Sequence, residues 1–391
     1  LYNKKLLNTN LRWEQSQTFE VGLDIGFLQN RFSFILDFYS RRTKDLLTKQ
    51  ALPGYTGFSD IVTNMGTLRN SGFEAEVKAN IINKGGFTWD MTANITSVAN
   101  KIISLPYNNV ENNRVGGYEV AAGKVDADGK FPTKWIAGRQ EGGKLGELVG
   151  YRQQHVFKDW DDVKQHANLR VDEVANLYGP GLADQINPAT GKTYKESSGW
   201  QPIEPGDACW EDINGDNIIN GYDRSVMGNI FPNVTGGFST TFGYKGLSLY
   251  ARFDYALGHT LYNDLKARSL GQYQGQFNII TDVKDMWSEA NPNSDLTKFY
   301  YADQLAKKNI TRSNNASTAA DNNSSRYYEK GDYLALREIT LSYQLPKSLI
   351  SKAHLTEASV YVTGQNLFYI TGYDGVSPEP AVSTTYGRGI D

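Results

Sequence analysis

GFEAEVKANIINKGGFTWDMTANI, residues 72–95, contains two runs of alternating apolar and polar residues joined by a short turn. The first apolar series begins at Phe73 and the second at Phe87, and polar or charged residues fill the positions between. Successive side chains of a β-strand point to opposite faces, so the segment predicts a hairpin with one apolar and one polar face. Each run is about ten residues long, against about five to six for a globular strand and about 9 to 11 for a membrane-spanning strand. We therefore expect the hairpin to cross a bilayer, with lipid on its apolar face and a wet lumen on the other.

The same alternation recurs along the chain and predicts eight strands, at residues 17–27, 32–47, 67–82, 87–97, 234–244, 247–258, 333–344 and 357–370. In the seventh strand, Leu334 and Leu336 change parity relative to Ile339, which a β-bulge would reconcile. The fold class expected is all-β, a transmembrane antiparallel β-barrel.

The links between these strands alternate strictly in length. Short links at 28–31, 83–86, 245–246 and 345–356 are interleaved with long ones at 48–66, 101–233 and 259–332. Outer-membrane barrels have short periplasmic turns and long external loops. We therefore expect the long loops to be extracellular. Within 101–233, weaker patterns predict short strands at 117–122 and 145–152 and a helix at 161–169, and polar residues 309–325 suggest mobility in the last loop.

Composition excludes several classes of protein. The chain has 391 residues and a net charge of −3, so nothing in its charge favours nucleic acid as a partner. No apolar run of roughly 18 residues predicts a transmembrane helix. The single cysteine, Cys209, excludes an internal disulfide framework, and four scattered histidines give no metal-ligand spacing. Because Leu1 begins the sequence without Met or a signal peptide, we expect a piece of a longer chain.

Several motifs, in this order and spacing, resemble the SusC/RagA family of TonB-dependent outer-membrane transporters from Bacteroidetes. They are LRWE at 11–14 with FEVGLD at 19–24, GFS at 57–59 with NMG at 64–66 and NSGFE at 70–74, GD at 206–207 with DINGD at 212–216, GDYL at 331–334 with ITL at 339–341, and GQNLF at 364–368 with GYD at 372–374. The resemblance implies a plugged barrel of about 22 strands, of which this chain would be the C-terminal portion. The plug, its TonB-contacting segment and the last strand would then lie outside the chain.

The resemblance also implies partners and a function. A SusD-like surface lipoprotein would close over the barrel as a lid, such barrel and lid pairs would form dimers, and TonB would act through the plug. The transporter would import oligosaccharides or, in some members, peptides across the outer membrane of a Gram-negative bacterium.

A second motif, DINGDNIINGYD at 212–223, has the spacing of a calcium-binding loop. Counting from Asp212, oxygen-bearing side chains fall at positions 1, 3, 5, 9 and 12, with a backbone carbonyl at position 7. Calcium takes six to eight hard oxygen ligands, so we expect a structural Ca²⁺ here. The expected ligands are Asp212, Asn214, Asp216, Ile218, Asn220 and Asp223. The alternative is an Asx-rich turn that caps itself without metal.

Two further groups of residues are candidates for contact with a transported molecule. The aromatic residues of the long loop, Tyr151, Trp160, Trp200 and Trp210, have faces suited to stacking on sugars, although such residues also fill the cores of long loops. The polar faces of the strands carry charges that either line a path, bond to a plug or are simply solvated by the lumen: Glu74, Glu76, Lys78, Asp90, Arg252 and Asp254.

No catalytic residues are expected. Carboxylates such as Asp161, Asp162 and Glu204 lack the spacing of an acid and base pair, and no nucleophile elbow or phosphate loop is present. Two other functions stay open, a passive outer-membrane porin and a soluble β-sandwich module that binds glycans. The sandwich would be soluble without detergent, and the porin would conduct ions in planar bilayers.

Overall fold

The structure is a computed structural model that describes residues 6–52, 54–172, 176–267, 269–270, 280–299 and 324–379. Residues 300–323, which include most of the segment expected to be mobile, lie outside the described part. No helix among the described residues is long and apolar enough to span a membrane.

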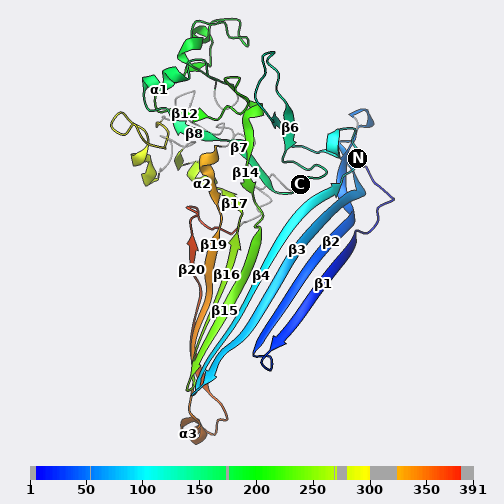
Figure 1. Ribbon diagram of the computed structural model, residues 1–391, viewed down its shortest axis with the longest axis vertical. Coiled ribbons are helices and arrows are strands. Elements are labelled where there is room, and N and C mark those ends of the chain that lie inside the picture. The colour runs from blue at the N-terminus through cyan, green and yellow to red at the C-terminus, as the bar shows by residue number, and fades with distance from the viewer. Residues whose placement is uncertain are drawn as a thin grey trace, which may run out of the picture.

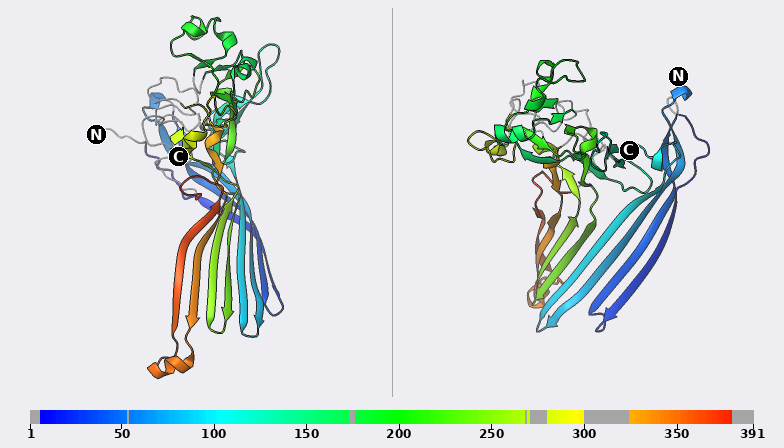
Figure 2. Two further views of the ribbon diagram at one scale, coloured as in Figure 1. Left: turned by 90° about the vertical axis from the view of Figure 1, so that its left-hand side faces the viewer. Right: turned by 45° about the horizontal axis from the view of Figure 1, so that its top comes forward.

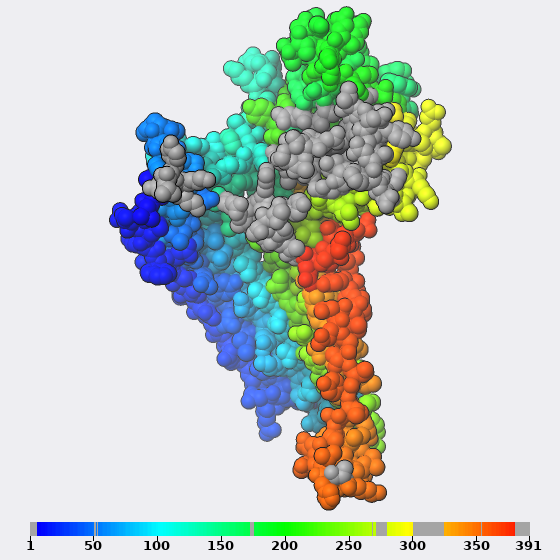
Figure 3. Space-filling view, turned by 180° about the vertical axis from the view of Figure 1, so that it is seen from behind, coloured from blue at the N-terminus to red at the C-terminus, as the bar shows by residue number. Residues whose placement is uncertain are grey.

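One antiparallel sheet of eight strands, in the order β1-β2-β3-β4-β15-β16-β19-β20, forms the body of the molecule (Figure 1). Its strands are β1 (Gln15–Phe27), β2 (Phe32–Ala51), β3 (Asp60–Lys84), β4 (Phe87–Ser104), β15 (Val234–Tyr244), β16 (Leu247–Leu257), β19 (Tyr333–Gln344) and β20 (Ser359–Thr371). The sheet is twisted and open, and the long loops gather at one of its ends (Figure 2). The short helix α3 (Lys347–Ile350) projects from the opposite end (Figure 3).

The two faces of this sheet differ in polarity as the alternation predicts. Phe19 and Val21 are 71% and 55% exposed on one face. The intervening Glu20 lies on the other, because the pairing of β1 with β2 is regular from end to end. Apolar side chains left bare on one whole face of a sheet are typical of strands that contact lipid.

Strands β2 and β3 are longer than their alternation predicts. They have 20 and 25 residues, so residues 60–66, expected to be loop, belong to β3. The register shifts between Thr43 and Leu46, and Asp45 has a φ of +56°. A bulge of this kind breaks the side-chain alternation while backbone pairing continues, which is why the pattern misses the extension. Similarly, β4 continues to Ser104 instead of ending near residue 97.

The segment between β4 and β15, residues 105–233, folds into a compact unit that we call the loop domain. Its strands and helix are β5 (Tyr118–Ala121), β6 (Thr133–Ile136), β7 (Glu147–Tyr151), β8 (Gln153–Val156), α1 (Trp160–Gln165), β9 (Arg170–Val171), β10 (Leu177–Tyr178), β11 (Gln201–Pro202), β12 (Ala208–Trp210), β13 (Ile218–Ile219) and β14 (Arg224–Asn229). Helix α1 is shorter than the expected 161–169 and begins at the cap Asp159, whose side chain accepts bonds from the N–H groups of Asp161 and Asp162. The main core of the domain includes Phe157, Val163 and Leu177.

Smaller elements lie between β16 and β19 in the sequence, at the end of the sheet where the loop domain also lies (Figure 1). Strand β17 (Thr260–Tyr262) pairs with β18 (Tyr328–Lys330), and α2 (Asp264–Ala267) follows β17. Ala267, Leu270 and Tyr327 form a small separate core there. This region and the loop domain therefore cover the same end of the sheet.

Candidate functional site

A β-bulge in β19 shapes the polar, inner face of the sheet. The register against β16 shifts so that Phe253 pairs with Leu336 while Arg252 pairs with Glu338, which leaves Arg337 as the extra residue. The expected bulge is therefore confirmed, and it lets the apolar residues on both sides of it stay on the outer face. A bulge often re-aims one side chain, and here that side chain is Arg337.

Arg337 links three strands and the segment that follows them. Its guanidinium makes a two-point ion pair with Asp254 of β16, in which Nη2 donates to Oδ2 at 2.9 Å. It also forms an ion pair with Glu379, and its Nη1 donates to the Tyr369 hydroxyl at 3.1 Å. That hydroxyl donates to Glu379 at 2.8 Å. Charge-assisted, two-point arginine bonds are among the strongest hydrogen bonds, so Arg337 fixes the segment after β20 to the inner wall.

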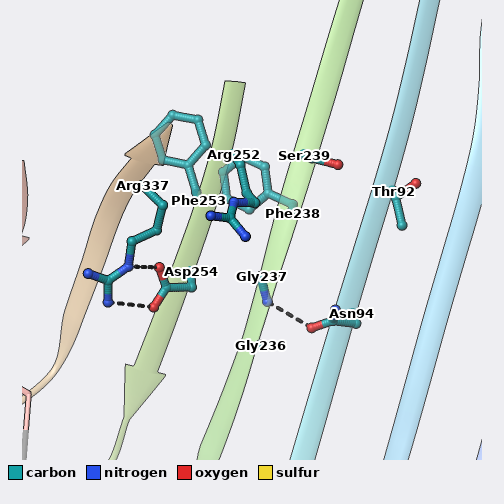
Figure 4. Close-up of a pocket in the computed structure, with 10 residues that line it drawn as sticks. All are labelled: Thr92, Asn94, Gly236, Gly237, Phe238, Ser239, Arg252, Phe253, Asp254 and Arg337. Carbon is teal, nitrogen blue, oxygen red and sulfur yellow. Dashed lines mark hydrogen bonds and ion pairs between the residues drawn. The ribbon is translucent and has the colours of Figure 1, made fainter. Parts of the chain in front are cut away.

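A hollow of about 450 Å³ lies beside this ion pair on strands β4, β15 and β16 (Figure 4). Its polar lining comes from side chains such as Thr92, Ser239 and Arg252, and the backbone N–H of Gly237 donates to Asn94 Oδ1 at 2.9 Å. Of the inward charges named from the sequence, Arg252 and Asp254 come together here. The lining offers donors and acceptors to a polar ligand and no nucleophile with an adjacent base.

A second charged junction ties the same C-terminal segment to α2. Lys266 Nζ lies 3.4 Å from Glu329 and 2.8 Å from Asp374. The buried ring of His259 bonds through Nε2 to the carbonyl of Pro378 at 3.0 Å. These partners, like Glu379, escaped sequence analysis because they lie outside every alternating strand. The sequence around Lys266 and Arg337 does not indicate which carboxylates form ion pairs with them.

The four loop aromatics have different surroundings. Tyr151 and Trp210 are 1% and 2% exposed and pack edge to face in the core of the loop domain, 6.4 Å between ring centroids. Trp200 packs against Tyr194 at 5.1 Å. Trp160, on α1, is 53% exposed. Core packing, the alternative left open by the sequence, therefore describes Tyr151 and Trp210, whereas Trp160 presents its ring to solvent.

The segment 212–223 forms a tight acidic turn. The two carboxylate oxygens of Asp212 accept bonds from the N–H groups of Gly215 at 2.6 Å and Asn217 at 2.8 Å. Asn217 has a φ of +63°, the left-handed conformation that the turn requires. Asp216 in the same way accepts the N–H of Ile218 at 2.7 Å. Each carboxylate has about four acceptor positions, so lone pairs remain after these bonds.

Asp223 closes this turn from a buried position. Its two oxygens accept the N–H groups of Ile213 at 2.8 Å and Asn220 at 2.9 Å, an arrangement that caps the short helical turn Gly221–Asp223. Burial, with a smaller effect from the charges of Asp212 and Asp216, raises the pKa of Asp223 to about 6, although these two hydrogen bonds act in the opposite direction. Within the described residues no group of three or more His, Cys, Asp or Glu side chains is placed to hold a metal ion. The bonds are those of the self-capping alternative, and the oxygen donors still suit a hard cation.

A sequence profile of the family described as TonB dependent receptor-like, beta-barrel, matches residues 2–201. The chain belongs to the TonB-dependent receptor β-barrel family. The expected resemblance and the expected fold class are thus confirmed, and the sheet is part of a transmembrane β-barrel of the outer membrane.

Relatives of known name agree with this family. TonB-dependent receptor P3 of Formosa agariphila is 28% identical over 372 residues, which cover 95% of this chain and 31% of that protein. TonB-dependent receptor SusC of Bacteroides thetaiotaomicron is 42% identical over 102 residues, 26% of this chain and 10% of that protein. A solved structure of the RagAB peptide transporter covers 95% of this chain and 34% of its own, with a TM-score of 0.62 and 22% identity. The chain spans about a third of the length of the curated receptors P3 and P26.

Proposed function

We propose that this TonB-dependent receptor chain is part of an active importer for a nutrient too large for porins, an oligosaccharide or a peptide. The observation that supports the proposal is a polar inner face of the sheet, one end of which is covered by the loop domain and by the segment after β20. The loop domain and the segment held by Arg337 both lie at one end of the sheet, next to the hollow of about 450 Å³. Import would depend on TonB acting through a plug, because the family is defined by that coupling.

The orientation and the partner belong to the same proposal. The crowded end with the loop domain faces the cell exterior, and the short turns face the periplasm, as in other outer-membrane barrels. A SusD-like surface lipoprotein would sit over this end as a lid, in line with the relatives named SusC and RagAB. Trp160, exposed on α1, is available to contact either the lid or a transported molecule.

Uptake in cells tests the proposal directly. A strain lacking the gene should lose growth on the polymer or peptide fraction that the wild type uses, and a strain lacking TonB should show the same loss. The purified protein in planar bilayers should be nearly silent, because a plugged barrel does not conduct. Steady conductance together with TonB-independent uptake would instead identify a passive porin.

We also propose that the turn at 212–223 binds Ca²⁺ with a structural role. The charges of Asp212 and Asp216 raise the pKa of Asp223, and a divalent cation bound by the carboxylate and amide oxygens of the turn would relieve that repulsion. The turn lies in the loop domain directly before β14, the last strand before β15, so the ion would stiffen the return of the chain to the sheet. Calorimetric titration of chelator-treated protein should show calcium uptake that is lost in the double variant Asp212→Ala and Asp216→Ala. Equal heats in both proteins would leave the self-capping turn as the correct description.

A further inference from the structure

Three basic residues form a row across neighbouring strands of the sheet. Arg42 of β2 pairs with Arg69 of β3, and Arg69 pairs with Lys101 of β4. Directly opposite residues on adjacent strands have their Cβ atoms about 5 Å apart. All three side chains are exposed. The row is therefore a dense patch of positive charge on the surface of the barrel wall.

The row lies on the outer, apolar face. On β2 the register against β3 is unbroken from Phe32 to Thr43, so Arg42 shares a face with Phe38. On β3, Arg69 shares that face with Phe73, and the rings of Phe38 and Phe73 meet at 4.9 Å between centroids. The basic row thus continues the lipid-facing surface beyond its aromatic residues, which in membrane barrels mark the interface.

The height of the row matches the headgroup layer. From Phe32, at the turn end of β2, to Arg42 is ten residues of regular pairing. That span is about 33 Å along a strand and about 25 Å along the membrane normal at a typical tilt, which equals the apolar band of an outer-membrane barrel. Arg42 and its neighbours therefore leave the hydrocarbon on the side of the long loops.

The row lacks a compensating anion within the chain. Among the described residues, no hydrogen bond or ion pair is made by the side chains of Arg42, Arg69 and Lys101. Lys44, two residues beyond Arg42 on the same strand, adds a fourth cation. Like charges placed directly opposite destabilise a sheet, so an unbalanced row of this kind is costly unless an external anion fills it.

We propose that this row binds the phosphate groups of a lipid headgroup in the outer leaflet. A phosphate carries the right charge, occurs at the right depth and accepts several arginine hydrogen bonds at once. The apolar residues below the row would contact the acyl chains of the same lipid. The inference uses the orientation proposed above only to name the leaflet, and the binding itself is independent of import.

The test compares two double variants of the detergent-purified protein. Arg42→Gln with Arg69→Gln removes two cations of the row. Arg41→Gln with Lys78→Gln removes two cations from the inner face of the same strands and serves as the matched control. Native mass spectrometry would measure binding of phosphatidic acid, with diacylglycerol, which has the same tails and no phosphate, as the second control.

We expect the wild type and the inner-face control to retain phosphatidic acid and to release diacylglycerol. The row variant should bind phosphatidic acid about thirtyfold more weakly, since each basic residue near a membrane surface contributes to anionic lipid binding. Equal binding of phosphatidic acid by both variants would overturn the proposal. A change of oligomeric state in the row variant without a change in lipid binding would also overturn it, and would assign the row to contact with a second copy. Loss of import with normal lipid binding would bear only on the transport proposal.

Discussion

Cys209 lies in the core of the loop domain, 1% exposed, on strand β12. Burial raises the pKa of its thiol to about 12, and the charge of Asp162 adds to that rise. The thiolate is the reactive form of cysteine, so a thiol held neutral in a packed core is inert. We expect iodoacetamide at pH 8 to leave the folded protein unlabelled and to label it in urea. Labelling of the native protein at the rate of a free peptide thiol would show that the core opens readily.

The raised pKa of Cys209 also predicts how the stability of the loop domain depends on pH. An unfolded cysteine titrates near pH 8.5, whereas the folded thiol stays protonated to about pH 12. When folding raises the pKa of a group, its contribution to the free energy of unfolding is complete below the unfolded pKa. This contribution is lost as the pH rises from the unfolded pKa to the folded pKa. The loop domain should therefore unfold more easily at pH 10 than at pH 8, and Cys209→Ser should reduce that difference. Urea titrations at both values of pH would measure it.

At the level of single elements, the bulge in β19 makes a prediction about stability. Arg337→Ala would leave Asp254 and Glu379 without their shared partner, and the Arg337 side chain is 19% exposed. Since the wet lumen screens the charges that remain, we expect a loss of about 1–2 kcal/mol, below the cost of a fully buried pair. Arg252→Ala on the neighbouring strand is the control, because Arg252 has no ion pair among the described residues. Urea unfolding in lipid vesicles should separate the two variants, and equal losses would contradict the assigned role of Arg337.

The strands also show which features of an element a sequence can encode. Lipid on one side and water on the other require alternation within the membrane, so β15, whose alternation is unbroken, has the bounds that its pattern predicts. Strand β19 also has its predicted bounds, because its bulge restores the outer face for the apolar residues beyond it. Beyond the bilayer that requirement ends, and the bulge at Asp45 let residues 60–66 resemble a loop although they pair. The bulge in β19 was predictable from parity alone. The partners of Arg337 were not, because Glu379 follows β20 in a segment without periodicity.

At the scale of the whole molecule, the two faces of the wall should respond oppositely to the same substitution. Ala93, on the outer face of β4, pairs with Val77 in the middle of the apolar band. Ala93→Arg should cost about 2–4 kcal/mol, whereas Thr92→Arg, one residue earlier and beside the inner hollow, should cost less than about 1 kcal/mol. Refolding yields in vesicles would compare them. Equal losses of stability in the two variants would mean that water reaches neither face, and that result would contradict a water-filled lumen.

The organisation of the loop domain lies largely beyond sequence reasoning, because its core is assembled from distant short strands. Tyr151 and Trp210 come from β7 and β12, and only their packing reveals that they are interior residues. The acidic turn was recognisable because its residues are local. Local spacing therefore predicts turns and strands in this chain, whereas contacts between loops depend on the whole fold.

The unequal lengths of the strands make the outer rim of this barrel wall uneven. Strands β2 and β3 run on for many residues past Arg42 and Arg69, whereas β15 and β16, with 11 residues each, are no longer than a bilayer crossing. The side of the sheet formed by β2 and β3 therefore extends farther beyond the bilayer than the side formed by β15 and β16. In the proposed orientation, Tyr55, which is 91% exposed in the turn between β2 and β3, lies at the outer tip of this part of the wall, where molecules that approach from outside the cell can reach it.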